Sequence, residues 1–296
     1  MRLAFHLDFN RWRPDSRGRT SEYCKPLRRW QAHSAVDLLK LQHRKTLTKI
    51  YKSEPYSEGS ETPLDILYQD ASYVVVNKPS GLLVHRSNLD ARETRFAVQL
   101  LRDQLGRRVF PVHRIDKPTS GALLFALDEE ALTRATAMLF DNRTYKKYLA
   151  IVRGFPPEFG IINRPLRKLR DGNRKSKSKD AQPSETRFRS LEYSELKYPT
   201  GRYPTTRYSL VSLTPRTGRR HQLRRHLAGI NHPIIGDTTH GDSRQNTSFR
   251  DRNGFLRLFL HASDLGFTHP FTDEPLTIQA PVPSDFREAN KACGLE

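Results

Sequence analysis

A run of nine residues, His-Arg-Ile-Asp-Lys-Pro-Thr-Ser-Gly, leads directly into six apolar residues at positions 122–127 and constrains the fold more than any other segment. The apolar residues predict a strand, and the Pro-Thr-Ser-Gly tail makes the chain turn before that strand begins. Asp116 stands in the turn, two residues after Arg114 and directly before Lys117. These cations favour the ionised form of the carboxylate. We interpret Asp116 as a nucleophile or general base; the alternative is a turn aspartate that accepts local backbone N–H bonds.

The remaining pattern, from residue 64 onward, is rich in strands and poor in helices. Helices are predicted at 96–105, ended by Gly106, at 128–141, begun by Asp128 as N-cap, and at about 220–228. Strands are predicted at 65–68, 73–77, 145–152, 186–193, 206–213 and, from the alternation of leucines with Arg257, Phe259 and His261, at 256–261. The basic stretch 166–181 predicts a solvated loop. The pattern indicates an α+β fold built on a mixed or antiparallel sheet.

The charge of the chain indicates a polyanionic partner. The 296 residues include 51 Lys and Arg against 32 Asp and Glu, a formal net charge of +19. Residues 1–62 contribute 13 of the cations and 7 of the anions, so 13 of the 19 excess positive charges belong to the rest of the chain. We interpret residues 1–62 as a basic, mobile N-terminal extension and residues 63–296 as the folded domain.

Metal, disulfide and membrane chemistry are disfavoured by the same sequence. Cys24 and Cys293 lie near opposite ends, in no metal-ligand or disulfide spacing, which fits a reducing cytoplasm. No apolar run approaches the ~20 residues that span a bilayer. Five histidines could suggest a metal site, but their irregular spacing matches no zinc-binding pattern: His221, His226, His232, His240 and His261. A metal-dependent nuclease is disfavoured because the sequence offers no credible cluster of metal ligands.

Four segments together resemble the motifs of the RluA-type pseudouridine synthases, in the family's order. They are residues 77–85 (NKPSGLLVH), 113–121 (HRIDKPTSG), 147–150 (KYLA) and 217–226 (TGRRHQLRRH). The resemblance extends from about residue 64 to residue 283. It implies the pseudouridine synthase fold, a large bent sheet with peripheral helices and a central cleft.

The resemblance also implies the chemistry of the site. Such enzymes break the C1′–N1 bond of a uridine, turn the uracil and rejoin it through C5, which requires neither a metal nor an organic cofactor. Asp116 matches the catalytic carboxylate, and Arg224 matches the cation that pairs with it, as a guanidinium held bidentately. Tyr148 matches the tyrosine that stacks on the uracil and assists proton removal from C5. Without the motif, Arg224 would be an exposed helix arginine and Tyr148 a core or strand-surface tyrosine.

RNA contacts are expected around these residues. Arg114 resembles the residue that helps to extrude the uridine. Further residues of the motifs are expected to contact the RNA: Lys117, Arg219, Arg220, His221 and Arg225. For His221, a structural role is the alternative to a phosphate contact.

The substrate is expected to be transfer RNA. Residues 84–87, 200–208 and 237–246, together with the Asp116 segment, look closer to the subgroup that acts at uridine 65, in the acceptor stem, than to the ribosomal RNA enzymes. A synthase that acts on ribosomal RNA and a non-catalytic RNA-binding protein are the competing interpretations. The expected protein is a cytoplasmic monomer.

Overall fold

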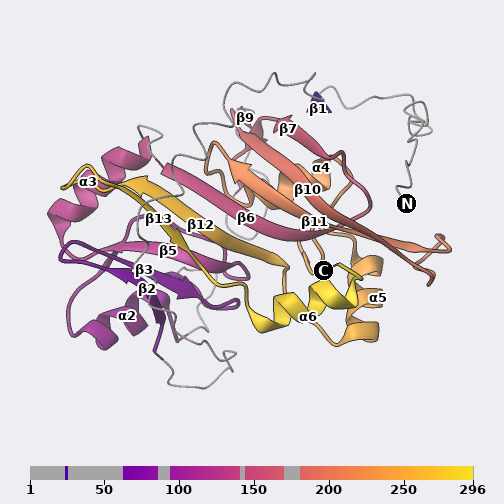
Figure 1. The fold of residues 1–296 in the computed structure, drawn as a ribbon, viewed down its shortest axis with the longest axis horizontal. Helices are drawn as coiled ribbons and strands as arrows, with labels where there is room; N and C mark the ends of the chain where they lie inside the picture. Colours follow the sequence, from indigo (N-terminus) through magenta and orange to yellow (C-terminus); the bar gives the residue numbers. More distant parts are fainter. Residues whose placement is uncertain (1–23, 26–62, 86–93, 141–143, 170–180, 296) are drawn as a thin grey trace, which may run out of the picture.

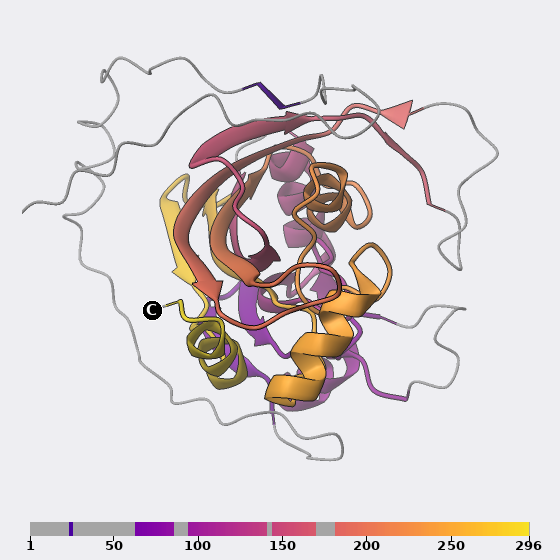
Figure 2. The same ribbon diagram turned by 90° about the vertical axis from the view of Figure 1, so that its right-hand side faces the viewer.

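An eleven-stranded mixed sheet forms the centre of the protein (Figure 1). The computed structural model describes residues 24–25, 63–85, 94–140, 144–169 and 181–295, and all structural statements below concern these residues. The sheet order is β1-β7-β10-β11-β6-β12-β5-β3-β2, with β13 beside β12 and β4 beside β5. All pairs are antiparallel except β5 with β12, which is parallel. The sheet is strongly bent, as Figure 2 shows, so the predicted α+β class and bent mixed sheet are confirmed.

The strands of this sheet are β1 (Cys24–Lys25), β2 (Asp65–Gln69), β3 (Tyr73–Lys78), β4 (Phe110–Pro111), β5 (Ser120–Ala126), β6 (Thr144–Arg153), β7 (Phe159–Asn163), β10 (Glu185–Leu196), β11 (Thr206–Pro215), β12 (Leu260–Thr268) and β13 (Pro275–Gln279). The helices are α2 (Ala97–Leu105), α3 (Glu129–Phe140), α4 (Gln222–Gly229), α5 (Ser243–Asn253) and α6 (Ser284–Ala292). No helix in the described ranges is long and apolar enough to cross a membrane.

The predicted helix ends have the expected causes. The Asp128 carboxylate accepts a hydrogen bond from the backbone N–H of Ala131 at 2.7 Å and so caps α3. Gly106 ends α2 in the left-handed conformation, with its N–H bonded to the carbonyl of Arg102. These local signals explain why both helices lie within two residues of their predicted bounds.

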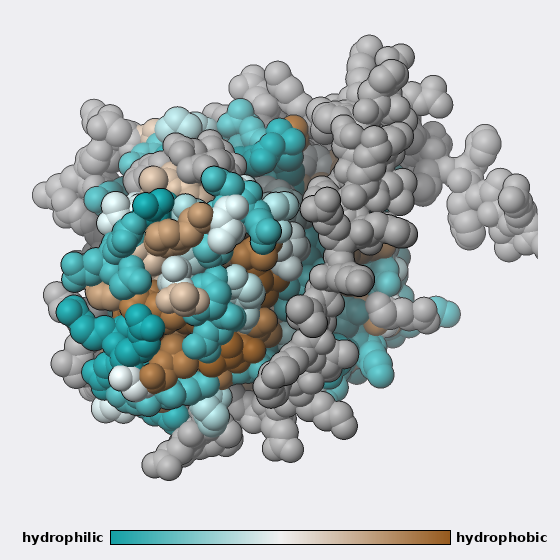
Figure 3. All heavy atoms as spheres, turned by 60° about the vertical axis from the view of Figure 1, so that its left-hand side comes forward, coloured by the Kyte–Doolittle hydropathy of each residue, from teal (hydrophilic) through white to brown (hydrophobic). Residues whose placement is uncertain are grey.

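The apolar run of β5 is buried on both faces, because a helix covers each of them. Leu124 faces the cluster that includes residues of α3, whereas Leu123 and Phe125 face the cluster that includes residues of α2. In Figure 3, the side of the molecule that carries these two helices shows a hydrophobic area surrounded by hydrophilic residues. The other half repeats the arrangement, since α4 packs on one face of β6 and β11 while α5 and α6 pack on the other. The two halves meet where β5 pairs with β12.

The predicted strand at 256–261 is wrong, because β12 begins only at Leu260. Leu256 is 80% exposed, whereas Leu258 and Phe259 are both buried. Leu258 enters the cluster under α4 and Phe259 the cluster under α5, so this connection fills both cores. The alternation of leucines therefore does not reflect one buried face.

Other elements were not predicted, namely β7, β13, α5 and α6. The ends of the predicted basic loop form a short ribbon, β8 (Leu166–Arg167) with β9 (Ala181–Gln182), and residues 170–180 lie outside the described residues. Strand β1 pairs with β7, and the rest of the predicted extension 1–62 also lies outside the described residues.

Gly121→Ala should destabilise the protein by about 3 kcal/mol or more. Gly121 has a φ of +112°, and a Cβ there would overlap the carbonyl oxygen of Ala262 on β12. Gly106→Ala is the matched control, since its φ is +64° with open space around the site, and should cost about 1–2 kcal/mol. Denaturant unfolding measures both, and equal losses would show that the contact between β5 and β12 is not tight.

Candidate active site

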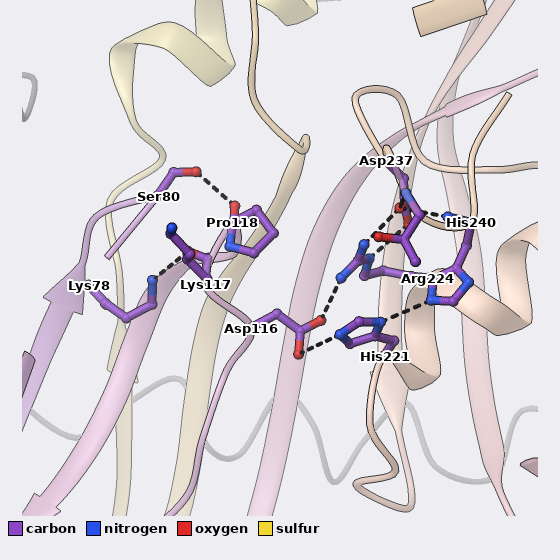
Figure 4. A network of polar contacts seen from close by, with 10 residues as sticks. Lys78, Ser80, Asp116, Lys117, Pro118, His221, Arg224, Asp237 and His240 are labelled. Carbon is purple, nitrogen blue, oxygen red and sulfur yellow. Dashed lines mark hydrogen bonds and ion pairs between the residues drawn. The ribbon is translucent and has the colours of Figure 1, made fainter. Parts of the chain in front are cut away.

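The Asp116 loop is tied to the end of β3 by a buried lysine (Figure 4). The Lys78 ammonium donates to the carbonyls of Pro79, Leu82 and Lys117 at 2.8, 2.7 and 3.1 Å. Burial, together with the smaller effect of the charge of Arg257, lowers the pKa of Lys78 to about 7. Three carbonyl acceptors nevertheless require three N–H donors, which only the ammonium form supplies. Lys78 therefore fixes the position of the residue that follows Asp116.

Further bonds define the shape of this loop. The Ser80 hydroxyl donates to the carbonyl of Pro118 at 2.7 Å, and the Gly81 N–H donates to that of Lys117 at 2.9 Å. Within the loop, the Thr119 N–H donates to the Asp116 carbonyl at 3.0 Å. The predicted turn before β5 is thus present, and the Asp116 side chain, 17% exposed, lies on its outer side towards α4 (Figure 4).

Arg224 of α4 faces Asp116, as the resemblance implied, but its bidentate partner is a different carboxylate. Its Nε and Nη2 donate to the two oxygens of Asp237 at 2.8 and 2.7 Å, whereas its Nη1 reaches Asp116 Oδ2 at 3.3 Å. The side chains of Arg224 and Asp237 are 4% and 1% exposed. The expectation that Arg224 holds Asp116 bidentately is therefore wrong: Nε and Nη2 form the fork with Asp237, and Asp116 accepts a bond from Nη1 on one oxygen.

Asp237 occupies a turn whose backbone also binds its carboxylate. The N–H groups of Thr239 and His240 donate to Asp237 Oδ1 at 2.9 and 3.0 Å. Burial raises the pKa of Asp237, but the hydrogen bonds and charge of Arg224 outweigh it and hold that pKa below its usual value. The preceding Gly236, at a φ of +80°, gives the turn its geometry. Sequence analysis used residues 237–246 only for the subgroup resemblance and missed the contact of Asp237 with Arg224.

Two histidines lie on the other side of the carboxylate. His221 Nε2 is 4.0 Å from Asp116 Oδ1, and His221 Nδ1 is 2.9 Å from His240 Nε2. Burial lowers the pKa of His221 to about 4, although the charge of Asp116 opposes this, and burial also lowers the pKa of His240. Both rings are therefore neutral at pH 7. His240 belongs to the segment 237–246, and sequence analysis did not place it beside His221.

Tyr148 lies on β6 and packs partly buried against the cluster under α4. Burial and the negative charge of Asp116 both raise the pKa of its phenol. Tyr148 therefore remains a protonated phenol at neutral pH.

The remaining predicted cations differ in exposure and in their partners. Arg114 is exposed, whereas Lys117 and Arg220 are half-buried. Arg219 donates from Nε to the carbonyl of Pro183 at 3.2 Å, and Arg225 from Nη1 to that of Arg167 at 3.1 Å. Burial lowers the pKa of Arg225. The described residues contain no group of three His, Cys, Asp or Glu side chains placed to hold a metal ion.

The chain belongs to the RNA pseudouridylate synthase family. The model of that family matches residues 72–229, a range that contains Asp116, Tyr148 and Arg224. The predicted membership in the pseudouridine synthase family is thereby confirmed.

Individual relatives are closely similar. The tRNA pseudouridine synthase C of Vibrio parahaemolyticus is 48% identical over 229 residues, which are 76% of this chain and 93% of that protein. The tRNA pseudouridine synthase C of Salmonella typhimurium is 50% identical over 229 residues, 76% of this chain and 88% of that protein.

Solved structures share the fold. Human RNA pseudouridylate synthase domain containing 1 superposes with a TM-score of 0.59 at 30% identity, over 78% of this chain and 87% of that chain. Human RNA pseudouridylate synthase domain containing 4 gives 0.61 at 26% identity, over 78% and 94%.

A third histidine, His226 of α4, has a structural role. His226 is fully buried, with Nε2 at 3.0 Å from the Arg164 carbonyl and Nδ1 at 2.9 Å from Thr186 Oγ1. A carbonyl accepts, so Nε2 carries the proton and Nδ1 accepts from the threonine hydroxyl. This neutral arrangement is satisfied on both nitrogens. Burial accordingly lowers the pKa of His226 to about 4.

Acid should destabilise the protein through His226. Because its pKa is lower in the folded than in the unfolded state, the unfolded chain binds more protons between about pH 6.5 and pH 4, and the free energy of unfolding falls as the pH falls through that range. His226→Gln should reduce this loss by about 1–3 kcal/mol. Denaturant unfolding at pH 7 and pH 4.5 measures it, with exposed His85→Gln as the control. An unchanged pH slope in the His226 variant would contradict the assignment.

Proposed function

We propose that the protein is a pseudouridine synthase that converts a uridine of transfer RNA, at position 65, into pseudouridine. The observation that carries the proposal is the Asp116 carboxylate, held on one oxygen by Arg224 within the family's matched range. The choice of transfer RNA over ribosomal RNA is supported by the names of the relatives at 48 and 50% identity. Position 65 is supported by the subgroup resemblance of residues 200–208 and 237–246.

Asp116 is proposed as the catalytic carboxylate. The isomerisation breaks the N1–C1′ bond, forms a C5–C1′ bond and moves one proton from C5 to N1, so no group or electron is imported. Arg224 anchors Oδ2 at 3.3 Å, whereas His221 Nε2 lies 4.0 Å from Oδ1, beyond hydrogen-bond distance. This leaves Oδ1 as the oxygen that acts on the nucleotide, either as a nucleophile or by removing a sugar proton.

Tyr148 is proposed to hold the detached base. Its aromatic face provides a stacking surface for uracil, which must stay bound while it turns. Burial and the charge of Asp116 raise the pKa of the phenol, so Tyr148 stays protonated and has no basic phenolate to accept the C5 proton. Tyr148 thus suits stacking better than removal of the C5 proton.

The surrounding cations are proposed to grip the RNA. Exposed Arg114 lies two residues from Asp116 and is placed to fill the gap left by an extruded uridine. Lys117, Arg219, Arg220 and Arg225 carry charges for the phosphates on either side of the site. We further propose that residues 63–296 are the catalytic domain, that residues 1–62 are an accessory basic extension, and that the enzyme acts as a cytoplasmic monomer.

Asp116→Asn should lower isomerisation at least about a hundredfold while RNA affinity stays within about twofold, because the change removes the reactive carboxylate and little of the basic surface. The assay is tritium release from 5-tritiated uridine in transfer RNA and in ribosomal RNA, with binding measured in parallel. Exposed Asp103→Asn is the control and should match the wild type.

The assay separates the parts of the proposal. Residual activity of Asp116→Asn within tenfold of the wild type would contradict the role of Asp116. Release from ribosomal RNA alone would overturn the substrate and keep the chemistry. No release from either RNA by the wild type would overturn the proposed function.

A further inference from the structure

His221 has a strained backbone conformation that helix capping does not explain. It precedes α4 with φ 54° and ψ 29°, the left-handed region that costs a residue other than glycine about 1–2 kcal/mol. Its side chain makes no capping bond to the helix. The conformation instead puts the imidazole, 11% exposed, between Asp116 and His240 (Figure 4). Strain of this kind at a non-glycine residue is typical of functional sites.

The rings of His221 and His240 are joined by a hydrogen bond, so only one of the two facing nitrogens carries a proton. At 2.9 Å, His221 Nδ1 and His240 Nε2 form a hydrogen bond in which one nitrogen donates and the other accepts. If His221 Nδ1 donated, the neutral ring would direct the Nε2 lone pair at Asp116 Oδ1, 4.0 Å away. If His240 Nε2 donates, His221 carries its proton on Nε2 and directs an N–H at that oxygen. Electrostatics favours the second arrangement.

We propose that His240 is a positioning residue that fixes His221 in its Nε2–H form, and that His221 thereby holds the second oxygen of Asp116 when substrate binds. The proposal rests on the proposed function for the role of Asp116. The distance of 4.0 Å is too long for a hydrogen bond and must shorten by about 1 Å, as hydrogen bonds at catalytic groups often do on substrate binding. Arg224 and His221 then each bind one oxygen and prevent rotation of the carboxylate, and the second lone pair of Oδ1 stays available to the nucleotide.

A neutral donor suits this position better than a second cation. Arg224 is already shared by two carboxylates, Asp237 and Asp116, so the three groups together carry one negative charge. That charge is the one a nucleophilic carboxylate needs. Protonated His221 would cancel it, whereas the neutral ring orients Asp116 and leaves its charge intact. Arg220 and Arg224 also face His221 and oppose its protonation.

His240→Phe tests the proposal, with His240→Gln as the matched variant. Phenylalanine keeps the ring volume and removes the donor; the glutamine amide can still donate to His221 Nδ1. The His240 backbone N–H, which binds Asp237, survives in both. Long-range proton–nitrogen NMR of histidine-labelled protein reads the tautomer of His221, and His221→Gln assigns its signals. We expect the Nε2–H form in the wild type and in His240→Gln, and a mixture of both tautomers in His240→Phe.

Kinetics on transfer RNA complete the test. His240→Phe should lower kcat at least about tenfold with KM and the melting temperature nearly unchanged, and His240→Gln should recover most of the loss. An unaltered tautomer in His240→Phe, or an unaltered kcat, would overturn the proposal, as would equal losses in both variants. The NMR result needs no activity, so a wild-type enzyme inactive on every RNA would overturn the proposed function alone.

Discussion

The buried pair of Arg224 and Asp237 determines the geometry of the rest of the site. Two parallel N–H···O bonds fix the plane of the guanidinium, and the turn that follows Gly236 fixes Asp237. The remaining nitrogen of the guanidinium, Nη1, then points across the junction between the two halves of the sheet and donates to Asp116. A buried arginine without such a partner would be strongly destabilising, and a flexible one could not orient a second carboxylate.

The two sides of the site are assembled independently of each other. On one side, Lys78 and Ser80 fix the loop that carries Asp116 from the end of β3. On the other, α4 and the Asp237 turn present Arg224 and the histidine pair. Close packing of β5 against β12 brings the two sides together, and Gly121 permits that approach. The Asp116 carboxylate thus lies where two separately supported elements meet, and each of its oxygens faces a group from α4 or the residue before it.

Local signals in the sequence were sufficient for several parts of the fold. Asp128 and Gly106 act within a few residues of themselves, so α3 and α2 were predictable. The loop at Asp116 was predictable because the proline and glycine that turn the chain and the apolar run that forms the next strand follow one another directly in the sequence. The true partner of Arg224 was not, because Asp237 lies thirteen residues away and the fork depends on the tertiary fold. The strand predicted at 256–261 was wrong for a similar reason, because only the tertiary fold places Leu258 and Phe259 in two different hydrophobic clusters.

The central claim is that Asp237 is the structural partner of Arg224 and that Asp116 is kept for chemistry. The free energies of unfolding of Asp237→Asn and Asp116→Asn, measured by denaturant at pH 7, test it most directly. Asp237→Asn should lose about 3–5 kcal/mol, because it removes the bidentate charged partner of a buried guanidinium and leaves only the single bond to Asp116, whereas Asp116→Asn should lose less than about 1 kcal/mol. Equal losses, or a greater loss for Asp116→Asn, would contradict the account.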